Sequence, residues 1–531
     1  MTTNISKEKR EILINKIKEI KQFIASSPQD ENTATLLSYI ADIEKDIKGK
    51  KYGLVFEEHK EAIDEILESN TPVLSEEKNL FIDNDGQMNF LIEGDNLASL
   101  QLLEKTHKGK IDLIYIDPPY NTGNKDFIYD DTFVDATDTF RHSKWCSFME
   151  KRLQIAKNLL ANNGVIFVSI DDNEVFNLKI LCDNVFGPGN FIDAVVWDKK
   201  ASAKGVPPRS MMVNVHEYIL VYQKQQGFRF LGEKRDLSGF KNPDNDPRGP
   251  WRESNIKSTI KPIEDAFTIV NPNNGKEYTN TWAFSKESLE RMIKENRILW
   301  KEHLPKQKEF MNEMTNENKA IKSNWGVFDP QSTTVYLKNL LPNIKFDNPK
   351  PISLMQYLLE VTSRANGIIL DFFAGSGTTG HAVMKLNAED GGNRKFILCT
   401  NNENNICRDV TYERIKRVIK KENYKASLKY MKVDFVPISD KLYYEYADEL
   451  LKHIKELVEL ENGINFDGNK ELAIILTEED LDNFTNNITD ECKTIYLGHN
   501  VLPTEEQEKL FKKHEIKINI IPDYYYRDLE G

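Results

Sequence analysis

Four consecutive residues, Asp117-Pro118-Pro119-Tyr120, combine groups that could hold a planar amine. The two prolines fix φ and remove two backbone donors, so the segment offers carbonyl and carboxylate acceptors with little competing donation. The two N–H groups of an exocyclic aryl amine would bond the Asp117 carboxylate and the Pro118 carbonyl, while Tyr120 stacks on the ring. Such bonds favour a tetrahedral nitrogen and return electron density to it for attack on a methyl sulfonium. The alternative is a strand that ends in a rigid Pro-Pro turn.

A second segment, DFFAGSGTTG (371–380), follows a predicted strand and opens a predicted helix. Backbone N–H groups at the helix start and the absent side chains of Gly375 and Gly377 leave room for a ligand, so we expect a cofactor site. The spacing also fits the dinucleotide pattern G-x-G-x-x-G, and Glu403, after the next strand, could hold the ribose hydroxyls of either cofactor class. No Lys follows Gly380, which excludes a phosphate-binding P-loop. A dinucleotide site, an S-adenosylmethionine site and a purely structural turn remain open.

Both segments lie in an alternation of short apolar runs and helical stretches. Parallel strands that are buried on both faces have such Ile- and Val-rich runs. Residues 145–160 follow a 3.6-residue period and predict a βαβ crossover, and ligand sites form at the strand carboxyl ends of doubly wound sheets. We therefore expect an α/β fold with a Rossmann-like sheet. Its expected strands are residues 88–95, 110–117, 164–171, 191–198, 216–224, 366–373 and 394–400.

The alternation stops for over a hundred residues after residue 224, which predicts an inserted domain. The net charge of −13 is unevenly spread: residues 199–262 hold 13 Lys/Arg and 6 Asp/Glu, whereas residues 441–531 hold 10 and 21. A basic middle in an acidic protein can be an electrostatic footprint for nucleic acid. An ordinary solvated surface is the alternative.

The two ends of the chain predict smaller parts. Apolar stripes over residues 9–24 and 36–47 indicate a helical hairpin, either a dimerisation or docking arm or a cap on the next domain. Candidate strands at 471–477 and 493–498 indicate a small acidic α/β domain. The expected domains are a helical N-terminal arm (1–78), a catalytic domain in two parts (79–198 and 346–430), an insertion (199–345) and an acidic C-terminal domain (431–531).

Composition excludes several classes of protein. No stretch of this chain, in which 39% of residues are hydrophobic and 29% charged, approaches the roughly 18 consecutive apolar residues of a membrane-spanning helix. The N-terminus shows no apolar segment typical of export signals. The five cysteines are scattered without C-x-x-C spacing, which argues against a disulfide framework and a zinc site. We expect a cytoplasmic protein without a metal.

Several segments in a fixed order resemble an amino-methylating DNA methyltransferase. The order, with the tetrapeptide ahead of the glycine turn and the insertion between them, resembles the β class of these enzymes. The first six segments are MNFLIEGDNLASLQLL (88–103), IYIDPPYNTGN (114–124), RHSKWCSFMEKRL (141–153), VHEYILVYQK (215–224), KPISLMQYLL (350–359) and DFFAGSGTTGHAV (371–383). Three more, YGLVFEEH (52–59), EDGGNRKFILCTNNENN (389–405) and LKYMKVDFVP (428–437), resemble the modification subunit of Type III restriction-modification systems.

The resemblance implies a Rossmann-like S-adenosylmethionine-dependent methyltransferase sheet with a target-recognition insertion. The tetrapeptide would be the catalytic clamp, and Asp rather than Ser in its first place favours N6 of adenine over N4 of cytosine. Glu403 matches the ribose-binding acid, Asp95 the acid near the cofactor's adenine amine, and Lys350 a residue near its methionine carboxylate. Asp95 could instead cap the following helix, and Lys350 could be a surface charge. The turn residues that would cradle the cofactor are Asp371, Phe373, Ala374, Gly375, Ser376, Gly377 and Thr378.

Side chains that could contact DNA are less specific. Two histidines, His142 and His216, could touch DNA or the extruded base, but single histidines beside aromatic residues are more often structural. Arginines of the basic stretch could contact phosphates or read guanine edges. They are Arg209, Arg229, Arg235, Arg248 and Arg252.

We therefore expect a site-specific adenine-N6 methyltransferase that transfers a methyl group from S-adenosylmethionine to a flipped-out adenine in double-stranded DNA, as the modification component of a Type III-like system. Alternatives are a cytosine-N4 methyltransferase of the same architecture, a stand-alone methyltransferase, a nicotinamide-dependent oxidoreductase and an idle DNA-binding module. The resemblance implies a homodimer. We find no convincing nuclease or helicase motif, so DNA cleavage would need a separate restriction subunit.

Overall fold

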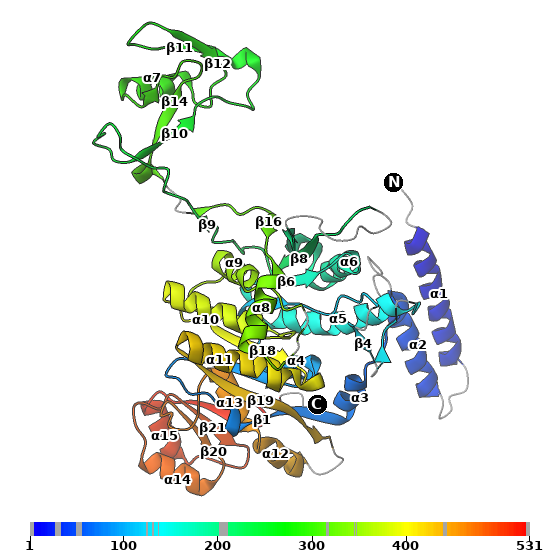
Figure 1. Ribbon diagram of the computed structural model, residues 1–531. Coiled ribbons are helices and arrows are strands. Elements are labelled where there is room, and N and C mark those ends of the chain that lie inside the picture. Colours follow the sequence, from blue (N-terminus) through cyan, green and yellow to red (C-terminus); the bar gives the residue numbers. More distant parts are fainter. Residues whose placement is uncertain are drawn as a thin grey trace. The chain divides into compact units, whose positions relative to one another are not determined.

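The computed structural model describes most of the chain and divides it into two compact units (Figure 1). The described residues are 5–26, 33–48, 56–123, 126–129, 132–135, 137–200, 211–314, 318–344, 346, 348–438 and 443–526. Unit 1 comprises residues 1–228, 323–356 and 364–531, and unit 2 comprises residues 229–322 and 357–363.

Unit 1 is built on a ten-stranded sheet with the order β1-β19-β2-β18-β17-β3-β6-β8-β7-β16. The strands from β19 to β6 run parallel, while β1 pairs antiparallel with β19 and β8 pairs antiparallel with both β6 and β7. The strands are β1 (Asn70–Glu76), β2 (Gln87–Glu93), β3 (Ile111–Ile116), β6 (Leu160–Ile170), β7 (Phe191–Asp198), β8 (His216–Gln223), β16 (Asn324–Val327), β17 (Ile368–Asp371), β18 (Lys395–Thr400) and β19 (Ala426–Pro437).

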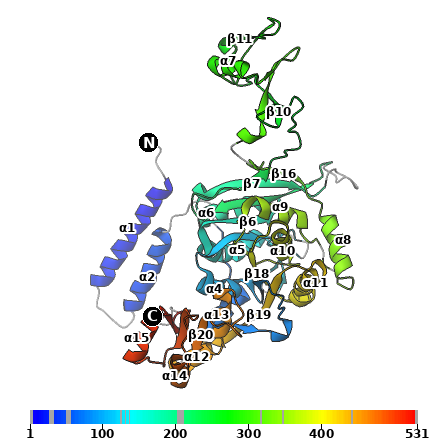
Figure 2. The same cartoon turned by 90° about the vertical axis from the view of Figure 1, so that its left-hand side faces the viewer.

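Helices cover both faces of this sheet and confirm the expected α/β class. Helices α4 (Asn96–His107), α5 (Arg141–Leu159) and α6 (Val175–Phe186) pack on one another on one face. Helices α9 (Ile352–Thr362), α10 (Thr378–Asp390) and α11 (Glu413–Glu422) cover the other (Figure 2). Because the central strands are covered on both sides, their side chains are almost all buried, which explains their continuous apolar runs.

The boundaries of the parts differ from the expected domains. Strands β8 and β16 both flank β7 in the large sheet, so the ends of the expected insertion 199–345 belong to unit 1. Strand β19, which crosses the expected boundary at 430/431, also pairs in this sheet. Two lysines interrupt its apolar pattern in the sequence, and one of them, Lys429, is fully buried in ion pairs with Glu76 and Glu459.

Unit 2 has its own small core. Its strands are β9 (Glu233–Lys234), β10 (Trp251–Asn255), β11 (Phe267–Val270), β12 (Glu277–Asn280), β13 (Ile298–Leu299), β14 (Lys306–Phe310) and β15 (Asn318–Lys319). Its described residues also include helix α7 (Lys286–Lys294) and the second half of α9. Trp282 is fully buried in this core beside Tyr278 and Leu289, and its indole nitrogen donates to the carbonyl of Phe267 at 2.8 Å. This tryptophan is therefore a core residue of unit 2.

The remaining elements of unit 1 lie mostly toward the chain ends. Helices α1 (Ile5–Ser26) and α2 (Thr33–Lys48) form the expected hairpin, with Lys21 paired to Glu44 at 2.6 Å. The C-terminal region adds a parallel sheet of β20 (Leu472–Ile475), β21 (Thr494–Gly498) and β22 (Lys517–Ile521). The other elements are α3 (Ala62–Ser69), the strands β4 (Ile128–Tyr129) and β5 (Thr132–Phe133), and the helices α8 (Pro330–Leu340), α12 (Tyr443–Leu451), α13 (Ile454–Asn462), α14 (Glu478–Asn486) and α15 (Glu505–Lys513).

Candidate active site

Three neighbouring strands bring the expected site segments to one edge of the sheet. Strand β17 pairs in parallel with β3 on one side and with β18 on the other. The tetrapeptide begins directly after β3, the glycine turn follows β17, and Glu403 lies three residues beyond β18. Because parallel strands end at the same edge, the tetrapeptide and the turn lie on adjacent strands, as ligand sites of doubly wound sheets require.

Hydrogen bonds hold the backbone of the tetrapeptide at Pro119 and directly after Tyr120. The indole nitrogen of Trp145, a fully buried residue of α5, donates to the carbonyl of Pro119 at 2.7 Å. The next residue after the tetrapeptide, Asn121, adopts a left-handed backbone conformation with φ of 56°. Its side-chain amide donates to the buried carboxylate of Glu174 at 2.6 Å and to the carbonyl of Arg141. The turn is therefore fixed by helix α5 and by the start of α6.

The side chains of the tetrapeptide belong to a cluster of alternating charges. Lys350 Nζ lies 3.2 Å from Asp117 Oδ1 and 2.7 Å from Glu217 Oε2. The Tyr120 hydroxyl lies 3.0 Å from Asp117 Oδ1 and 3.1 Å from Glu217 Oε2, and it accepts a hydrogen bond from Lys350. Lys199 Nζ lies 3.3 Å from Glu217 Oε1. Lys350, which we expect near the cofactor's methionine carboxylate, also lies against the tetrapeptide.

The cluster shifts the pKa values of its members in a consistent way. Burial raises the pKa of Asp117, and the neighbouring Lys350 ammonium opposes this rise. Burial alone would also raise the pKa of Glu217, but Lys350 and Lys199 outweigh it and lower that pKa. Burial would lower the pKa of Lys350, yet Asp117 and Glu217 outweigh it and raise that pKa. Lys350 and Glu217 therefore form a charged pair next to a carboxyl that is harder to ionise.

The glycine turn has the conformation that only glycine adopts readily. Gly375 and Gly377 have φ values of 49° and 74°. A Cβ atom on Gly377 would lie 3.1 Å from the Thr411 side chain, and one on Gly380 would lie 3.1 Å from the side chains of Ile415 and Leu398. The absent side chains thus let the turn pack against Thr411 and let α10 pack closely on β18, while Gly375 remains partly exposed, which fits a cofactor cradle as well as a tight turn.

Asp371, the last residue of β17, is turned into the protein. Its carboxyl accepts a 2.5 Å hydrogen bond from the Thr379 hydroxyl and a 3.0 Å bond from the Phe373 amide. The residue is only 2% exposed, and burial raises its pKa to about 7. Asp371 therefore ties the two ends of the turn together from inside.

A buried arginine that sequence reasoning missed holds the turn from behind. Arg414 of α11 is fully buried and donates to the Ser376 carbonyl at 3.1 Å and to the Ser376 and Thr378 hydroxyls at 2.8 Å each. The hydroxyl of Thr411 donates to the Gly375 carbonyl at 2.5 Å. No carboxylate of the described residues pairs with Arg414. Its signal in the sequence was its place beside Ile415 on the apolar stripe of an otherwise charged helix.

Two expected cofactor residues have simpler environments. Asp95 caps α4, because its carboxylate accepts from the Leu97 amide at 2.7 Å, and it lies 3.7 Å from Arg152. Its side chain remains 37% exposed, so it can cap the helix and still face a ligand. Glu403 is exposed and accepts a 2.7 Å hydrogen bond from the Asn401 side chain.

Two of the expected DNA-contacting arginines are engaged within unit 2. Arg248 forms a two-pronged pair with Asp246, at 2.8 and 2.7 Å, and its guanidinium lies 4.4 Å from the Phe310 ring centre. Arg252 pairs with Glu309 at 2.7 Å. These two side chains therefore stabilise the unit. Arg229 is exposed, and Arg209 lies outside the described residues.

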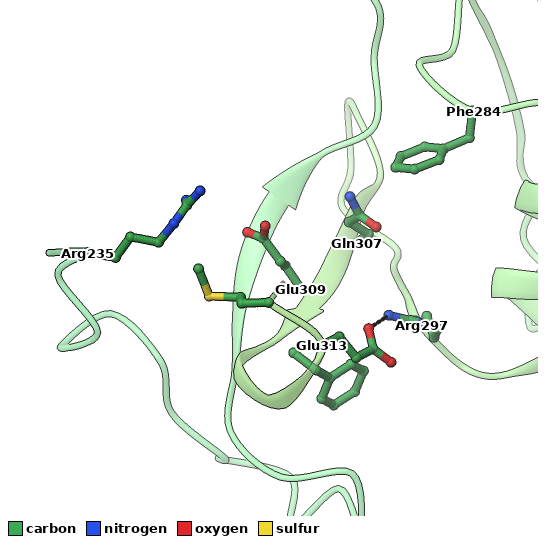
Figure 3. A pocket seen from close by; sticks show the side chains of 8 residues that line it. Arg235, Phe284, Arg297, Gln307, Glu309 and Glu313 are labelled. Atoms are coloured by element: carbon green, nitrogen blue, oxygen red, sulfur yellow. Dashed lines mark hydrogen bonds and ion pairs between the residues drawn. The ribbon is translucent and has the colours of Figure 1, made fainter. Parts of the chain in front are cut away.

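The fifth of these arginines lines a pocket of about 290 Å³ within unit 2. Figure 3 shows Arg235 on one side of this pocket and Phe284 and Gln307 on the other, with Arg297 paired to Glu313 near its base. The pocket mixes charged, amide and aromatic groups. Its full lining is Arg235, Phe284, Arg297, Gln307, Glu309, Phe310, Glu313 and Met314.

The two histidines singled out in the sequence have hydrogen-bond partners. His142 Nδ1 lies 2.6 Å from Glu174 Oε1, and His216 Nε2 lies 3.0 Å from the Tyr218 hydroxyl. Over the described part of the chain, no group of three or more His, Cys, Asp or Glu side chains could hold a metal ion. In that same part, no helix is long and apolar enough to cross a membrane. All five cysteines are free and buried.

Residues 111–413, more than half of the chain, match a family model described as DNA methylase. The chain is 34% identical over 377 residues to the Mod subunit of the StyLTI Type III restriction-modification enzyme of Salmonella typhimurium, a match that covers 64% of this chain and 57% of the relative. It is 32% identical to the EcoPI Mod subunit of Escherichia phage P1, over 60% of this chain and 58% of that subunit. The chain thus spans less than two thirds of the length of these subunits.

A shorter relative and a solved structure match as well. The Type II methyltransferase M.KpnI of Klebsiella pneumoniae is 33% identical over 58% of this chain and 79% of its own length. A DNA modification methylase from Thermus thermophilus, solved in complex with S-adenosyl-L-methionine, aligns with 64% of this chain and 99% of its own, at 15% identity and a TM-score of 0.32.

Proposed function

Because this chain belongs to the DNA methylase family, we propose that it transfers a methyl group from S-adenosylmethionine to N6 of a flipped-out adenine in double-stranded DNA. We further propose that it is the modification component of a Type III-like restriction-modification system, as the StyLTI and EcoPI Mod subunits are by name. Its cleaving partner would be a separate helicase-nuclease subunit.

The observation that carries the proposal is the placement of the tetrapeptide and the glycine turn on adjacent strands, β3 and β17. Asp117 Oδ1 is engaged by Tyr120 and Lys350, whereas no described residue bonds Asp117 Oδ2 or the Pro118 carbonyl. These two acceptors match the two N–H groups of an exocyclic amine. The clamp would hold the amine nitrogen with its lone pair aimed at the methyl donor, so that positioning and electrostatics supply the rate.

The residues at the carboxyl ends of β2, β17 and β18 fit S-adenosylmethionine. When bound, this cofactor supplies a methyl group on a positively charged sulfur. Ser376 and the N-cap residue Gly377 lead into α10, which begins at Thr378 and whose first N–H groups suit a polar ligand. Asp95 and the exposed Glu403 would bond its adenine amine and ribose hydroxyls. The remaining proposed contacts are Phe373, Ala374 and Gly375, with Lys350, at the tetrapeptide, near the methionine carboxylate. The buried Asp371 would support the turn from inside.

Asp117 has a second task once the amine has taken the methyl group. The nitrogen then carries a positive charge and must lose one proton to give the neutral methylated amine. The carboxylate is the nearest base, and burial raises its pKa and so its proton affinity. We assign Asp117 the removal of this proton. The adenine must first leave the DNA stack, which costs a few kcal/mol.

Unit 2 would bind the DNA, with the exposed Arg229 contacting phosphate and Arg235 in the pocket of Figure 3 reading base edges. The hairpin α1–α2 would pair with a second copy, because it presents large apolar side chains: Phe23 is 70%, Tyr39 60% and Ile43 53% exposed. As an enzyme of cellular DNA with five free cysteines, the protein would act in the cytoplasm.

The test is to incubate the purified protein with unmodified bacterial DNA and methyl-labelled S-adenosylmethionine, digest the DNA and identify the labelled nucleoside by mass spectrometry. Labelled N6-methyladenine is the expected result. Labelled N4-methylcytosine would keep the mechanism but overturn the base assignment, and no label on any base would overturn the proposal. The variant Asp117→Ala should bind cofactor and DNA but transfer no methyl group.

A further inference from the structure

Glu217 is a buried charged residue on β8, a strand whose central residues 219–222 are largely apolar and buried. Only 10% of its side chain is exposed. An ionised carboxylate at such a position requires charged partners. It has two, Lys350 at 2.7 Å and Lys199 at 3.3 Å, and the Tyr120 hydroxyl lies 3.1 Å away. Two of these contacts are to groups at the tetrapeptide, Lys350 and Tyr120. The third is to Lys199, which lies beside the other oxygen of Glu217.

The two oxygens of Asp117 have different surroundings. Oδ1 lies 3.2 Å from Lys350 Nζ and 3.0 Å from the Tyr120 hydroxyl. Oδ2 has no partner among the described residues, and 28% of the Asp117 side chain is exposed. The carboxylate is thus held by one oxygen and presents the other.

The contact between Lys350 and Asp117 must be neither too strong nor absent. A lysine paired with Asp117 alone would draw the carboxylate into a tight ion pair and weaken it as an acceptor and base. Without any lysine, Asp117 would face the carboxylates of Glu217 and Asp371 in a buried site and would protonate. Lys350 lies closer to Glu217 than to Asp117, so its charge is shared between them.

We propose that Glu217 is a positioning residue for methyl transfer: it holds Lys350 between two carboxylates, so that Asp117 is oriented through Oδ1 without being drawn into a tight ion pair, while Oδ2 remains available to the target amine. The inference rests on the proposed function and deepens it by adding a residue to its site. Lys199, the outermost member of the cluster, balances the second oxygen of Glu217.

The arrangement predicts opposite pH effects for the two partners of the pair. The charged and titratable groups that face Asp117 are Lys350, Glu217, Tyr120 and Tyr115 of β3, and Asp371 of β17; Glu217 in turn faces Lys199 and Asp171. Glu217→Gln removes a negative charge near Asp117, which favours its ionised form and lowers its pKa. Lys350→Met removes the positive charge and raises that pKa.

The experiment measures kcat and KM from pH 5.5 to 9.5 for the full-length protein, with unmodified bacterial DNA and labelled S-adenosylmethionine. For Glu217→Gln we expect kcat to fall by about tenfold or more, as displaced catalytic groups do, with both KM values within about twofold. The acid limb of the kcat–pH profile should move to lower pH for Glu217→Gln and to higher pH for Lys350→Met. In the double variant, adding Glu217→Gln should lower kcat little further than Lys350→Met alone does, because both substitutions act through one contact.

A matched control separates positioning from folding. Glu459 forms a fully buried Glu–Lys pair with Lys429, at 2.5 Å, outside the proposed site. Glu459→Gln should lower stability but leave kcat per folded molecule and the pH profile unchanged. If Glu217→Gln behaves like Glu459→Gln, Glu217 has only a structural role and the inference is wrong. A wild-type protein that methylates no DNA overturns the proposed function and the inference with it, whereas an active wild type with an unaffected Glu217→Gln overturns the inference alone.

Discussion

The indole nitrogen of Trp145 donates a 2.7 Å hydrogen bond to the carbonyl of Pro119. Because the prolines cannot donate to neighbouring backbone, this bond from helix α5 is a main anchor of the tetrapeptide. The same helix carries Arg152, which is fully buried and paired with Glu61. One helix thus connects the proposed amine clamp to the interior of unit 1.

Trp145→Phe should keep the aromatic packing but remove this anchor. Leaving the Pro119 carbonyl without its donor should lower the free energy of unfolding by about 1–3 kcal/mol. Methyl transfer should slow while cofactor affinity stays unchanged, since the glycine turn does not contact this indole. Urea unfolding, cofactor titration and turnover check the three parts. Wild-type turnover in the variant would show that the tetrapeptide holds its shape without the anchor.

Arg414→Met should separate stability from cofactor binding. Replacing a buried, unpaired charge by an apolar side chain of similar length is often neutral for stability, so we expect a change within about 2 kcal/mol. The glycine turn loses three hydrogen bonds, at Ser376 and Thr378. We therefore expect about tenfold weaker binding of S-adenosylmethionine, measured by calorimetry. Arg414→Lys should recover part of the affinity; unchanged affinity in the Met variant would refute the role.

Asp371 should make stability depend on pH in an unusual direction. Burial raises its pKa in the folded protein from 3.8 to about 7, so the folded state binds the proton more tightly. The stability it contributes is complete below about pH 4 and is lost as the pH rises through 7. Relative to wild type, Asp371→Asn should gain up to about 4 kcal/mol between pH 4 and pH 8. Chemical unfolding across this range tests it, and parallel curves for the two proteins would contradict it.

Arg229 and Arg248 should respond differently to substitution by alanine. Arg229 is exposed, so its loss should weaken DNA binding and reduce the slope of log affinity against log salt by about 1 without changing stability. Arg248 is paired with Asp246 and lies on Phe310, so its loss should destabilise unit 2. Fluorescence anisotropy and thermal unfolding distinguish the two. An unchanged salt slope for Arg229→Ala would remove it from the DNA-binding surface.

The strands with continuous apolar runs could be predicted from the sequence. The expected strands at 110–117, 191–198 and 216–224 correspond to β3, β7 and β8 within about one residue at each end. Apolar periodicity sufficed there because burial on both faces leaves no polar positions. Strand β19 was missed as a strand because its buried Lys429 interrupts the pattern, and the cost of that burial is offset by carboxylates distant in the chain.

Only those parts of the site that are contiguous in the sequence could be predicted from it. The tetrapeptide and the glycine turn are contiguous, so their residue types reveal their conformations. The role of Lys350 was expected near the cofactor, but its contacts depend on Glu217, which lies 133 residues away in sequence. Arg414 lies on the apolar stripe of a charged helix, but only the fold shows that Ser376 is its partner. Contacts across such separations are set by packing, which a single sequence does not reveal.

The insertion leaves the sheet after β8 and returns to it at β16, and both strands flank β7. Sheet pairing therefore fixes where the inserted segment leaves the sheet and where it rejoins it, whatever residues lie between. Within unit 2, the bonds that join Leu231 and Glu233 to Val361 and Tyr357 of α9 would have to be kept. With those retained, we expect the segment to be exchangeable as a unit: under the proposed function, a different insertion would bring a different DNA specificity while the methyl-transfer site stays unchanged.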